Sequence, residues 1–207
     1  VIARGGVGLD NIDVDHAKGK GISVINTPAA SSQAVAELVF GHLFSLARFL
    51  HQSNRAMPTK GDTDFKVLKK SFAKGIQVRG KTIGIIGIGR IGQETARIAL
   101  GLGMNVIPVD PYIEEVKVEV AAFNGESFKV KLKTQPMDDM LAAADFISLH
   151  IPFLGQPVLA AEEFAKMKKG VIIVNASRGG TIDEGALLGA LEAGIVTAAG
   201  LDVFENE

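Results

Sequence analysis

The chain has 207 residues, of which 47% are hydrophobic and 22% are charged, so it can form an apolar core and is not intrinsically disordered as a whole. Its 22 basic and 23 acidic residues nearly cancel, which excludes a bulk positive field for binding nucleic acid or anionic lipid. Because cysteine is absent, a disulfide framework, a zinc–thiolate site and a thiol nucleophile are excluded. The absence of cysteine suits a cytoplasmic protein, and no metal site is expected.

Short apolar runs, each followed by a turn and then a helical pattern, make up most of the chain. The apolar runs are nearly continuous and often β-branched, which is typical of strands covered on both faces. Strands are predicted at residues 1–3, 22–25, 82–86, 104–109, 146–149, 171–174 and 198–201. Helices are predicted at residues 13–18, 31–52, 91–102, 160–167 and 183–193. This alternation predicts an α/β fold with a doubly wound parallel sheet of the Rossmann type.

The predicted helix at residues 31–52 contains the most apolar stretch of the chain. Glu37, His42 and Arg48 interrupt that stretch, whereas a membrane span needs roughly 20 predominantly apolar residues. No membrane crossing is therefore expected. The apolar content is nevertheless more than one buried stripe requires, which favours burial on several sides, within one subunit or between two.

Two segments depart from the strand–helix alternation. Residues 53–74 are polar and lack strong periodicity, so we expect a long surface loop with at most short helical pieces. Residues 116–133 alternate apolar and polar side chains around Asn124-Gly125, a strong hairpin signal. They predict an antiparallel hairpin with one solvated face, and the alternative is an irregular charged loop.

The most informative motif is Gly87-Ile-Gly89-Arg-Ile-Gly92, which follows a predicted strand and opens a predicted helix. Gly87 permits a tight turn, Gly89 lets a pyrophosphate approach the backbone, and Gly92 lets the helix pack closely on its strand. The positive N-terminal end of the helix favours the diphosphate. Asp110 ends the next strand about 20 residues later, where it can accept hydrogen bonds from both ribose hydroxyls and would repel a 2′-phosphate. The motif predicts a dinucleotide site that favours NAD over NADP, beside which Arg90 either contacts the diphosphate or is solvated.

A second polar cluster, Asn175-Ala-Ser-Arg178-Gly-Gly, follows another buried strand. Ligands of doubly wound sheets bind outside the carboxyl ends of the strands, which places Arg178 at the mouth of the cofactor cleft. Its guanidinium can hold a carboxylate in fork geometry, and the alternative is an arginine that caps a surface loop. Asp202 and two glutamates follow the last predicted strand at the same edge.

These motifs together resemble the D-isomer-specific 2-hydroxyacid dehydrogenases over nearly the whole chain. The resemblance rests on RGGVGLDNID, NTPAASSQAVAEL, GIIGIGRIG, Asp110, SLHIP, VNASRGGTIDEGAL and GLDVFENE, in order and at the family's spacing. It is closest to the branch that oxidises D-3-phosphoglycerate to 3-phosphohydroxypyruvate in serine biosynthesis. It implies NAD as cofactor, a small 2-hydroxy or 2-keto acid as substrate, and a cytoplasmic homodimer that pairs through the cofactor domains. The alternatives are a family member acting on D-lactate, glycerate, glyoxylate or hydroxypyruvate, and an NAD-sensing binding protein similar to the family's corepressors.

The resemblance also implies site residues. Those expected to bind the cofactor are Gly87, Gly89, Arg90, Ile91, Gly92, Asp110, His150, Pro152, Ala176, Arg178 and Asp202. Those expected to bind the substrate are Arg4, Val7, Gly8 and Arg178. Arg178 and Glu207 are the expected catalytic residues: the arginine polarises the substrate carbonyl, and the glutamate orients a histidine and raises its pKa for proton transfer.

The resemblance finally implies a domain division. Residues 1–27 match the last piece of the first segment of a flavodoxin-like substrate domain, and residues 28–207 match the NAD-binding domain. The family's catalytic histidine is expected beyond Glu207, and none of the histidines present matches its position, so the chain is expected to bind NAD without completing the reaction. The predicted hairpin replaces a short helical segment of the family, and no function is assigned to it.

Overall fold

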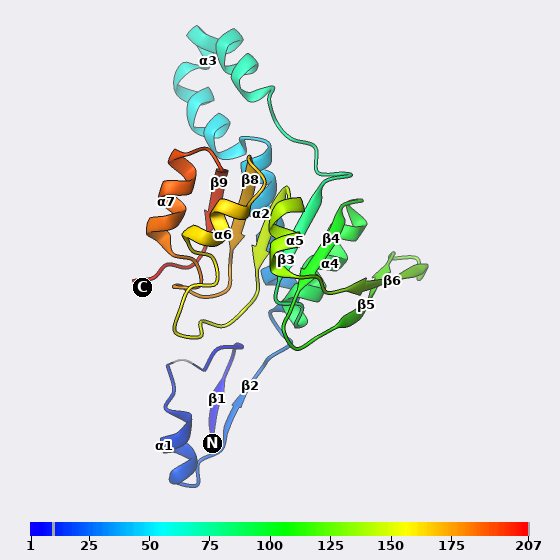
Figure 1. Cartoon of the computed structure of the whole chain (residues 1–207), viewed down its shortest axis with the longest axis vertical. Coiled ribbons are helices and arrows are strands. Elements are labelled where there is room, and N and C mark those ends of the chain that lie inside the picture. Colours follow the sequence, from blue (N-terminus) through cyan, green and yellow to red (C-terminus); the bar gives the residue numbers. More distant parts are fainter. Residues whose placement is uncertain (10, 207) are drawn as a thin grey trace.

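A five-stranded parallel sheet forms the centre of the molecule in the computed structural model, which describes residues 1–9 and 11–206 (Figure 1). Its strand order is β4-β3-β7-β8-β9. The strands are β3 (Thr82–Ile86), β4 (Asn105–Val109), β7 (Phe146–Leu149), β8 (Val171–Asn175) and β9 (Val196–Leu201). The chain runs from β3 outward to β4 and then returns to β7 on the other side of β3. The predicted doubly wound sheet is therefore confirmed, and its direction of winding reverses between β3 and β7.

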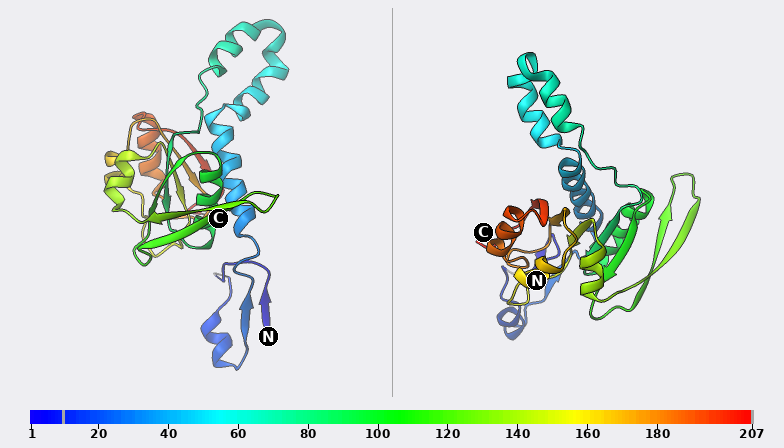
Figure 2. Two further views of the ribbon diagram at one scale, coloured as in Figure 1. Left: turned by 90° about the vertical axis from the view of Figure 1, so that its right-hand side faces the viewer. Right: turned by 45° about the horizontal axis from the view of Figure 1, so that its top comes forward.

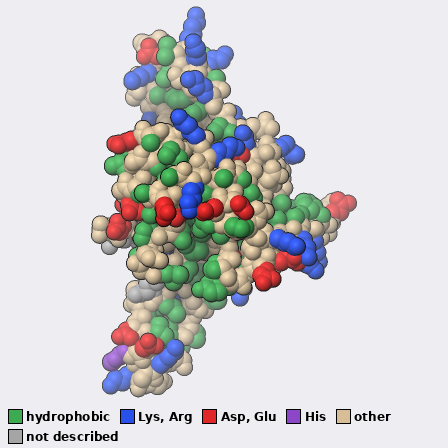
Figure 3. All heavy atoms as spheres, viewed as in Figure 1, with side chains coloured by type: hydrophobic (Ala, Val, Ile, Leu, Met, Phe, Trp, Pro, Cys, Tyr) green, Lys and Arg blue, Asp and Glu red, His purple; other side chains and the backbone are tan. Residues whose placement is uncertain are grey.

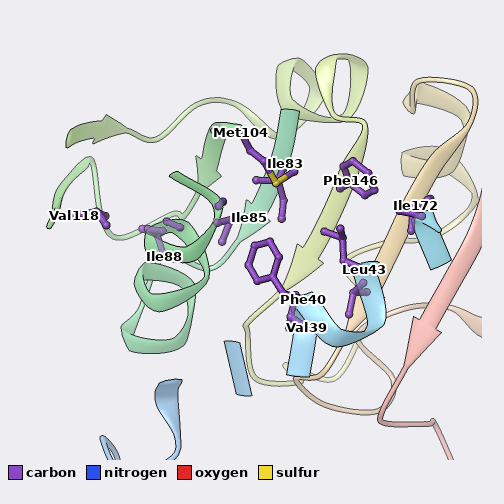
Figure 4. Close-up of a cluster of buried hydrophobic side chains, with 14 of the residues drawn as sticks. Val39, Phe40, Leu43, Ile83, Ile85, Ile88, Met104, Val118, Phe146 and Ile172 are labelled. Atoms are coloured by element: carbon purple, nitrogen blue, oxygen red, sulfur yellow. The ribbon is translucent and has the colours of Figure 1, made fainter. Parts of the chain in front are cut away.

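Helices cover both faces of this sheet and enclose two apolar cores. The helices α2 (Ser32–Ala47) and α4 (Arg90–Gly101) pack on one face, and α5 (Met137–Ala143), α6 (Ala161–Lys166) and α7 (Glu184–Glu192) pack on the other. Successive residues of a strand point into different cores. Ile85 belongs to the core under α2 and α4, whereas Ile86 belongs to the core under α5, α6 and α7. Figure 4 shows Phe40 and Leu43 of α2 pointing at the strands that they cover. Of these helices, α5 was not predicted from the sequence.

The predicted loop at residues 53–74 is wrong, because this segment is helical. The predicted helix at 31–52 ends at Ala47, Phe49 adopts left-handed backbone angles (φ 56°), and α3 (Leu50–Phe72) begins directly after it. A kink at Asp64 (φ −116°, ψ 18°) divides α3, and Pro58 lies inside it. No residue of α3 is buried, and the helix extends away from the sheet (Figures 1 and 2). The segment is polar overall, and Pro58 within it reads as a helix breaker, so the sequence did not identify it as a helix.

The predicted hairpin is confirmed. Strands β5 (Glu115–Ala121) and β6 (Ser127–Lys133) pair antiparallel, and Gly125 takes the positive φ of 87° that their turn requires. Val118 and Leu132 are buried in the core beside α4, while lysine and glutamate side chains of alternate positions face solvent. The hairpin projects from the β4 edge of the sheet, and its charged side chains are visible in Figure 3.

A smaller unit precedes the sheet. Strands β1 (Ile2–Arg4) and β2 (Val24–Asn26) pair in parallel, with α1 (Val14–Gly19) between them, as the sequence predicts. This unit lies at one end of the molecule, below the carboxyl ends of the central strands (Figure 1). Within the described residues, no single helix is long and apolar enough to cross a membrane, and α2 and α3, bent by 52°, pass that test of length and composition only as a pair.

Candidate functional site

A cavity of about 720 Å³ lies between the N-terminal unit and the carboxyl ends of the central strands. It opens beside the point where the sheet reverses its winding, which is where ligands of this architecture bind. The structure brings together eight of the predicted site residues in its wall: Arg4, Val7, Gly8, Ile91, His150, Pro152, Ala176 and Arg178. The wall also contains residues that sequence reasoning missed: Asn11, Ser31, Val35, Ile151, Ser177, Gly179 and Val203.

The glycine turn has a distinct steric requirement at each glycine. Gly87 has a φ of 91°, and a Cβ atom there would lie 2.7 Å from the carbonyl oxygen of His150, so β3 and β7 can adjoin at the turn. A Cβ atom at Gly92 would lie 2.1 Å from the carbonyl oxygen of Gly87, so only glycine lets α4 start this close to β3. At Gly89 no heavy atom lies within 4 Å of the Cβ position, so the N-terminus of α4 faces open space. This space fits a diphosphate.

Asp110 follows β4 directly and is fixed by three backbone donors. Its Oδ2 accepts a hydrogen bond from the amide of Ile88 at 3.0 Å, and its Oδ1 accepts from the amides of Tyr112 at 2.9 Å and Ile113 at 3.2 Å. A carboxylate has about four lone-pair directions, so Oδ2 retains capacity for about one further hydrogen bond. The geometry ties Asp110 to the glycine turn and leaves room for one ribose hydroxyl without rearrangement.

His150 follows β7 and presents a neutral imidazole to the cavity wall. Its Nε2 lies 3.1 Å from Oγ1 of Thr95 and 2.9 Å from Oγ of Ser148. Because the Thr95 hydroxyl donates to the carbonyl of Ile91 at 3.0 Å, its oxygen accepts from Nε2–H, which assigns the hydrogen to Nε2. Burial lowers the pKa of His150 to about 4. Nδ1 is buried and has no hydrogen-bond partner among the described residues. Such an orphaned acceptor fits a cofactor that carries amino, amide and hydroxyl donors.

Asn175, which is not among the predicted site residues, organises the loop that carries Arg178. It is only 2% exposed at the end of β8. Its amide nitrogen donates to the Arg178 carbonyl at 3.3 Å and to Thr181 Oγ1 at 3.0 Å, and its amide oxygen accepts from the Ser177 amide and hydroxyl. Arg178 Nη1 donates to the carbonyl of Ser177 at 2.7 Å. A buried polar residue that ends an otherwise apolar strand was the available signal for this network.

The remaining predicted residues lie outside the cavity wall. Arg90 is exposed at the first residue of α4, and Asp202 is exposed just after β9, where its amide donates to the Asn175 carbonyl at 2.9 Å. Arg4 differs from these residues because it lines the cavity. Its side chain is exposed, and its Nε donates a hydrogen bond to the carbonyl of Gly8 at 3.4 Å. Glu207 lies outside the described residues. Within residues 1–9 and 11–206, no cluster of three or more His, Cys, Asp or Glu side chains is arranged to hold a metal ion.

Comparisons with known proteins agree with this geometry. Residues 40–207 match the family model described as "D-isomer specific 2-hydroxyacid dehydrogenase, NAD binding domain". The whole chain is 47% identical to a D-3-phosphoglycerate dehydrogenase of Methanocaldococcus jannaschii, of which it covers 37%. It is 45% identical to a hydroxypyruvate reductase of Thermotoga maritima, of which it covers 62%. It superposes on the apo structure of D-lactate dehydrogenase from Escherichia coli with a TM-score of 0.78 and 33% identity, covering all of this chain and 61% of the other. The chain thus spans less than two thirds of each of these proteins.

Proposed function

Since this chain belongs to the D-isomer-specific 2-hydroxyacid dehydrogenases and contains their NAD-binding domain, we propose that it serves the NAD-dependent oxidation of D-3-phosphoglycerate to 3-phosphohydroxypyruvate. We place this reaction in serine biosynthesis in the cytoplasm. The observation that carries the proposal is the single cavity that Arg4, Val7 and Gly8 share with His150 and Arg178. Bound NAD supplies the hydride acceptor for carbon 2 of the substrate.

Each element at the sheet edge has a proposed role toward the cofactor. The backbone at Gly89 and the first turn of α4, including Arg90 and Ile91, hold the diphosphate. Asp110 accepts a hydrogen bond from the adenosine ribose, and His150 and Pro152 line the adenine side. Ala176 and Arg178 face the nicotinamide, while Asp202 accepts a hydrogen bond from its carboxamide. In support, the open space at Gly89 and the orphaned Nδ1 of His150 both match the groups that NAD presents.

The substrate is bound from the opposite wall of the cavity. The backbone amides of Val7 and Gly8 donate to its carboxylate, with Arg4 nearby. Arg178 contacts the oxygen on carbon 2 and stabilises the negative charge that develops there. Glu207 orients the histidine that takes up the hydroxyl proton and raises its pKa. With the carboxylate held by Val7 and Gly8 and the oxygen on carbon 2 held by Arg178, Arg4 in the same cavity wall is available to pair with a phosphate, which favours a phosphorylated substrate.

A second candidate substrate is hydroxypyruvate, because a relative named hydroxypyruvate reductase is 45% identical to this chain. Hydroxypyruvate differs from 3-phosphohydroxypyruvate by a phosphate group, so the relative kcat/KM for these two keto acids distinguishes the candidates. The test follows NADH oxidation by the full-length protein with 3-phosphohydroxypyruvate, hydroxypyruvate, pyruvate and glyoxylate. We expect kcat/KM to be at least about tenfold higher for the phosphorylated acid, the effect of roughly one charge-assisted hydrogen bond. A preference for any other acid overturns the substrate assignment, and tight NADH binding without any turnover indicates a binding protein.

We further propose that residues 1–27 belong to a substrate domain, that residues 28–207 form the cofactor domain, and that cofactor domains pair into a homodimer. In support, α3 buries none of its residues and exposes Phe65 and Val67 by 53% and 65%, which is expensive for a helix without a partner. Sedimentation of the native chain and of a Phe65→Glu, Val67→Glu variant tests the pairing. We expect a dimer and a monomer, respectively, and a native monomer at micromolar concentration contradicts the dimer.

A further inference from the structure

The segment at residues 202–206 has no regular secondary structure, yet it follows β9 at the edge of the candidate site. It carries Asp202, the proposed acceptor for the nicotinamide carboxamide. A side chain on such a segment can act only if tertiary contacts fix the backbone, since each free residue costs about 1–2 kcal/mol to order. Contacts at Asp202, Phe204 and Glu205 join the segment to the rest of the sheet edge.

Two of these contacts involve the loop that carries Arg178. The Asp202 amide donates to the carbonyl of Asn175 at 2.9 Å, which continues the β8–β9 pairing by one residue. Farther along, the carbonyl of Phe204 lies directly over Gly179: a Cβ atom at Gly179 would be 1.7 Å from that oxygen. The backbone after Arg178 and the backbone after Asp202 are therefore in direct contact, and no larger residue fits at Gly179.

The third contact comes from α7. Glu184 is the first residue of this helix, and its Oε1 accepts a hydrogen bond from the amide of Glu205 at 2.7 Å. The helix end is itself fixed, because Asp183 is the N-cap and its Oδ1 accepts from the amide of Ala186 at 2.8 Å. A carboxylate in the first turn is also favoured by the helix dipole. Glu184 thus connects a rigid helix to a segment without secondary structure.

We propose that Glu184 is a positioning residue, which holds residues 202–206 against the Gly179 backbone so that Asp202 and Arg178 keep a fixed separation at the nicotinamide side of the cleft. The inference rests on the proposed function, in which Asp202 contacts the carboxamide. Glu184 places Asp202 and does not itself touch the cofactor. Loss of Glu184 should therefore weaken binding of the nicotinamide end of NAD and leave binding of the adenosine end unchanged.

The first experiment measures amide hydrogen exchange of Glu205 in the native chain and in Glu184→Ala, Glu184→Gln and Glu192→Ala. Glutamine keeps an acceptor oxygen, and Glu192 is an exposed acid at the other end of the same helix. We expect exchange about tenfold faster in Glu184→Ala, the effect of losing one hydrogen bond, with the glutamine and Glu192 variants near the native rate. An unchanged rate in Glu184→Ala overturns the proposal regardless of what the protein catalyses.

The second experiment compares the affinities of the same variants for NADH and for ADP-ribose, which lacks the nicotinamide. We expect Glu184→Ala to weaken NADH binding about fivefold and to leave ADP-ribose binding unchanged, with glutamine restoring NADH affinity. A purely structural contribution would change both affinities or neither, and either result contradicts the positioning role. If the native chain binds NADH and ADP-ribose equally, the proposed contact between Asp202 and the nicotinamide is wrong, and the positioning role of Glu184 is wrong with it. The exchange data would still report whether Glu184 holds residues 202–206.

Discussion

Gly92 and Gly89 show how two glycines of one motif meet different demands. A Cβ atom at Gly92 would lie 2.1 Å from the Gly87 carbonyl oxygen, whereas at Gly89 it would meet no heavy atom within 4 Å. Gly92 is therefore required by packing within the protein. Gly89 has an ordinary φ of −69°, so an alanine there is compatible with the fold and occupies only the space proposed for the diphosphate.

The first prediction compares alanine substitutions at Gly92 and Gly89. Gly92→Ala should lower the free energy of unfolding by about 1–3 kcal/mol, because the new methyl group overlaps a backbone carbonyl. Gly89→Ala should change the unfolding free energy by less than about 0.5 kcal/mol and yet abolish measurable NADH binding. Chemical denaturation and fluorescence titration of both variants test the pair. Native NADH affinity in Gly89→Ala would show that the diphosphate lies elsewhere.

His150 gives the second prediction, which concerns pH. The folded chain protonates His150 only near pH 4, whereas an exposed histidine takes up its proton near 6.5. Between these pH values the unfolded chain binds more protons, so the free energy of unfolding falls as the pH falls, by up to about 3 kcal/mol from this group. Above pH 6.5 and below pH 4 the contribution of His150 to the free energy of unfolding no longer changes with pH.

The measurement is the free energy of unfolding as a function of pH in the native chain and in His150→Asn. Asparagine does not titrate, so the native chain should lose more stability than the variant between pH 6.5 and 4. Parallel curves for the two proteins would mean that the imidazole is accessible to protons in the folded state.

At the scale of elements, the hairpin β5–β6 is anchored by its apolar face. Val118 is 4% exposed, whereas its neighbour Lys117 points to the solvated face. We predict that Val118→Ala costs about 2 kcal/mol of stability, and that Lys117→Ala changes it by less than about 0.5 kcal/mol. Equal effects in denaturation experiments would indicate that the hairpin does not pack against α4 in solution.

The elements also show which patterns in the sequence are informative. The hairpin was predictable because Asn124-Gly125 and strict alternation specify both its turn and its register. The central strands were predictable because burial on both faces produces continuous apolar runs. In contrast, α3 buries no residue and contains Pro58, so neither periodicity nor propensity identified it as a helix. The short helix α5 has only 7 residues, about two turns, and its buried residues are Met140 and Leu141, which is too little for a periodic pattern.

At the scale of the whole molecule, the sequence predicted the glycine turn, Asp110 and Arg178 because local motifs encode them. It did not predict the hydrogen-bond network of Asn175 or the contact between Glu184 and residues 202–206, because these depend on which strand ends become neighbours after folding. Ser31 and Val35 were missed for the same reason: they reach the cavity only because α2 starts beside the N-terminal unit. Local sequence patterns thus identify candidate cofactor-binding groups more readily than the residues that hold the surrounding loops in place.

The most direct test of the account is a fluorescence titration of this chain with NADH, with Asp110→Ala as the matched variant. We predict saturable binding with a dissociation constant below about 1 mM, weakened at least about tenfold in the variant by loss of one hydrogen bond to a charged group. The native chain should also bind NADPH more weakly than NADH, because Asp110 repels a 2′-phosphate. No fluorescence change at millimolar NADH, or equal affinity in Asp110→Ala, would contradict the cofactor site described above.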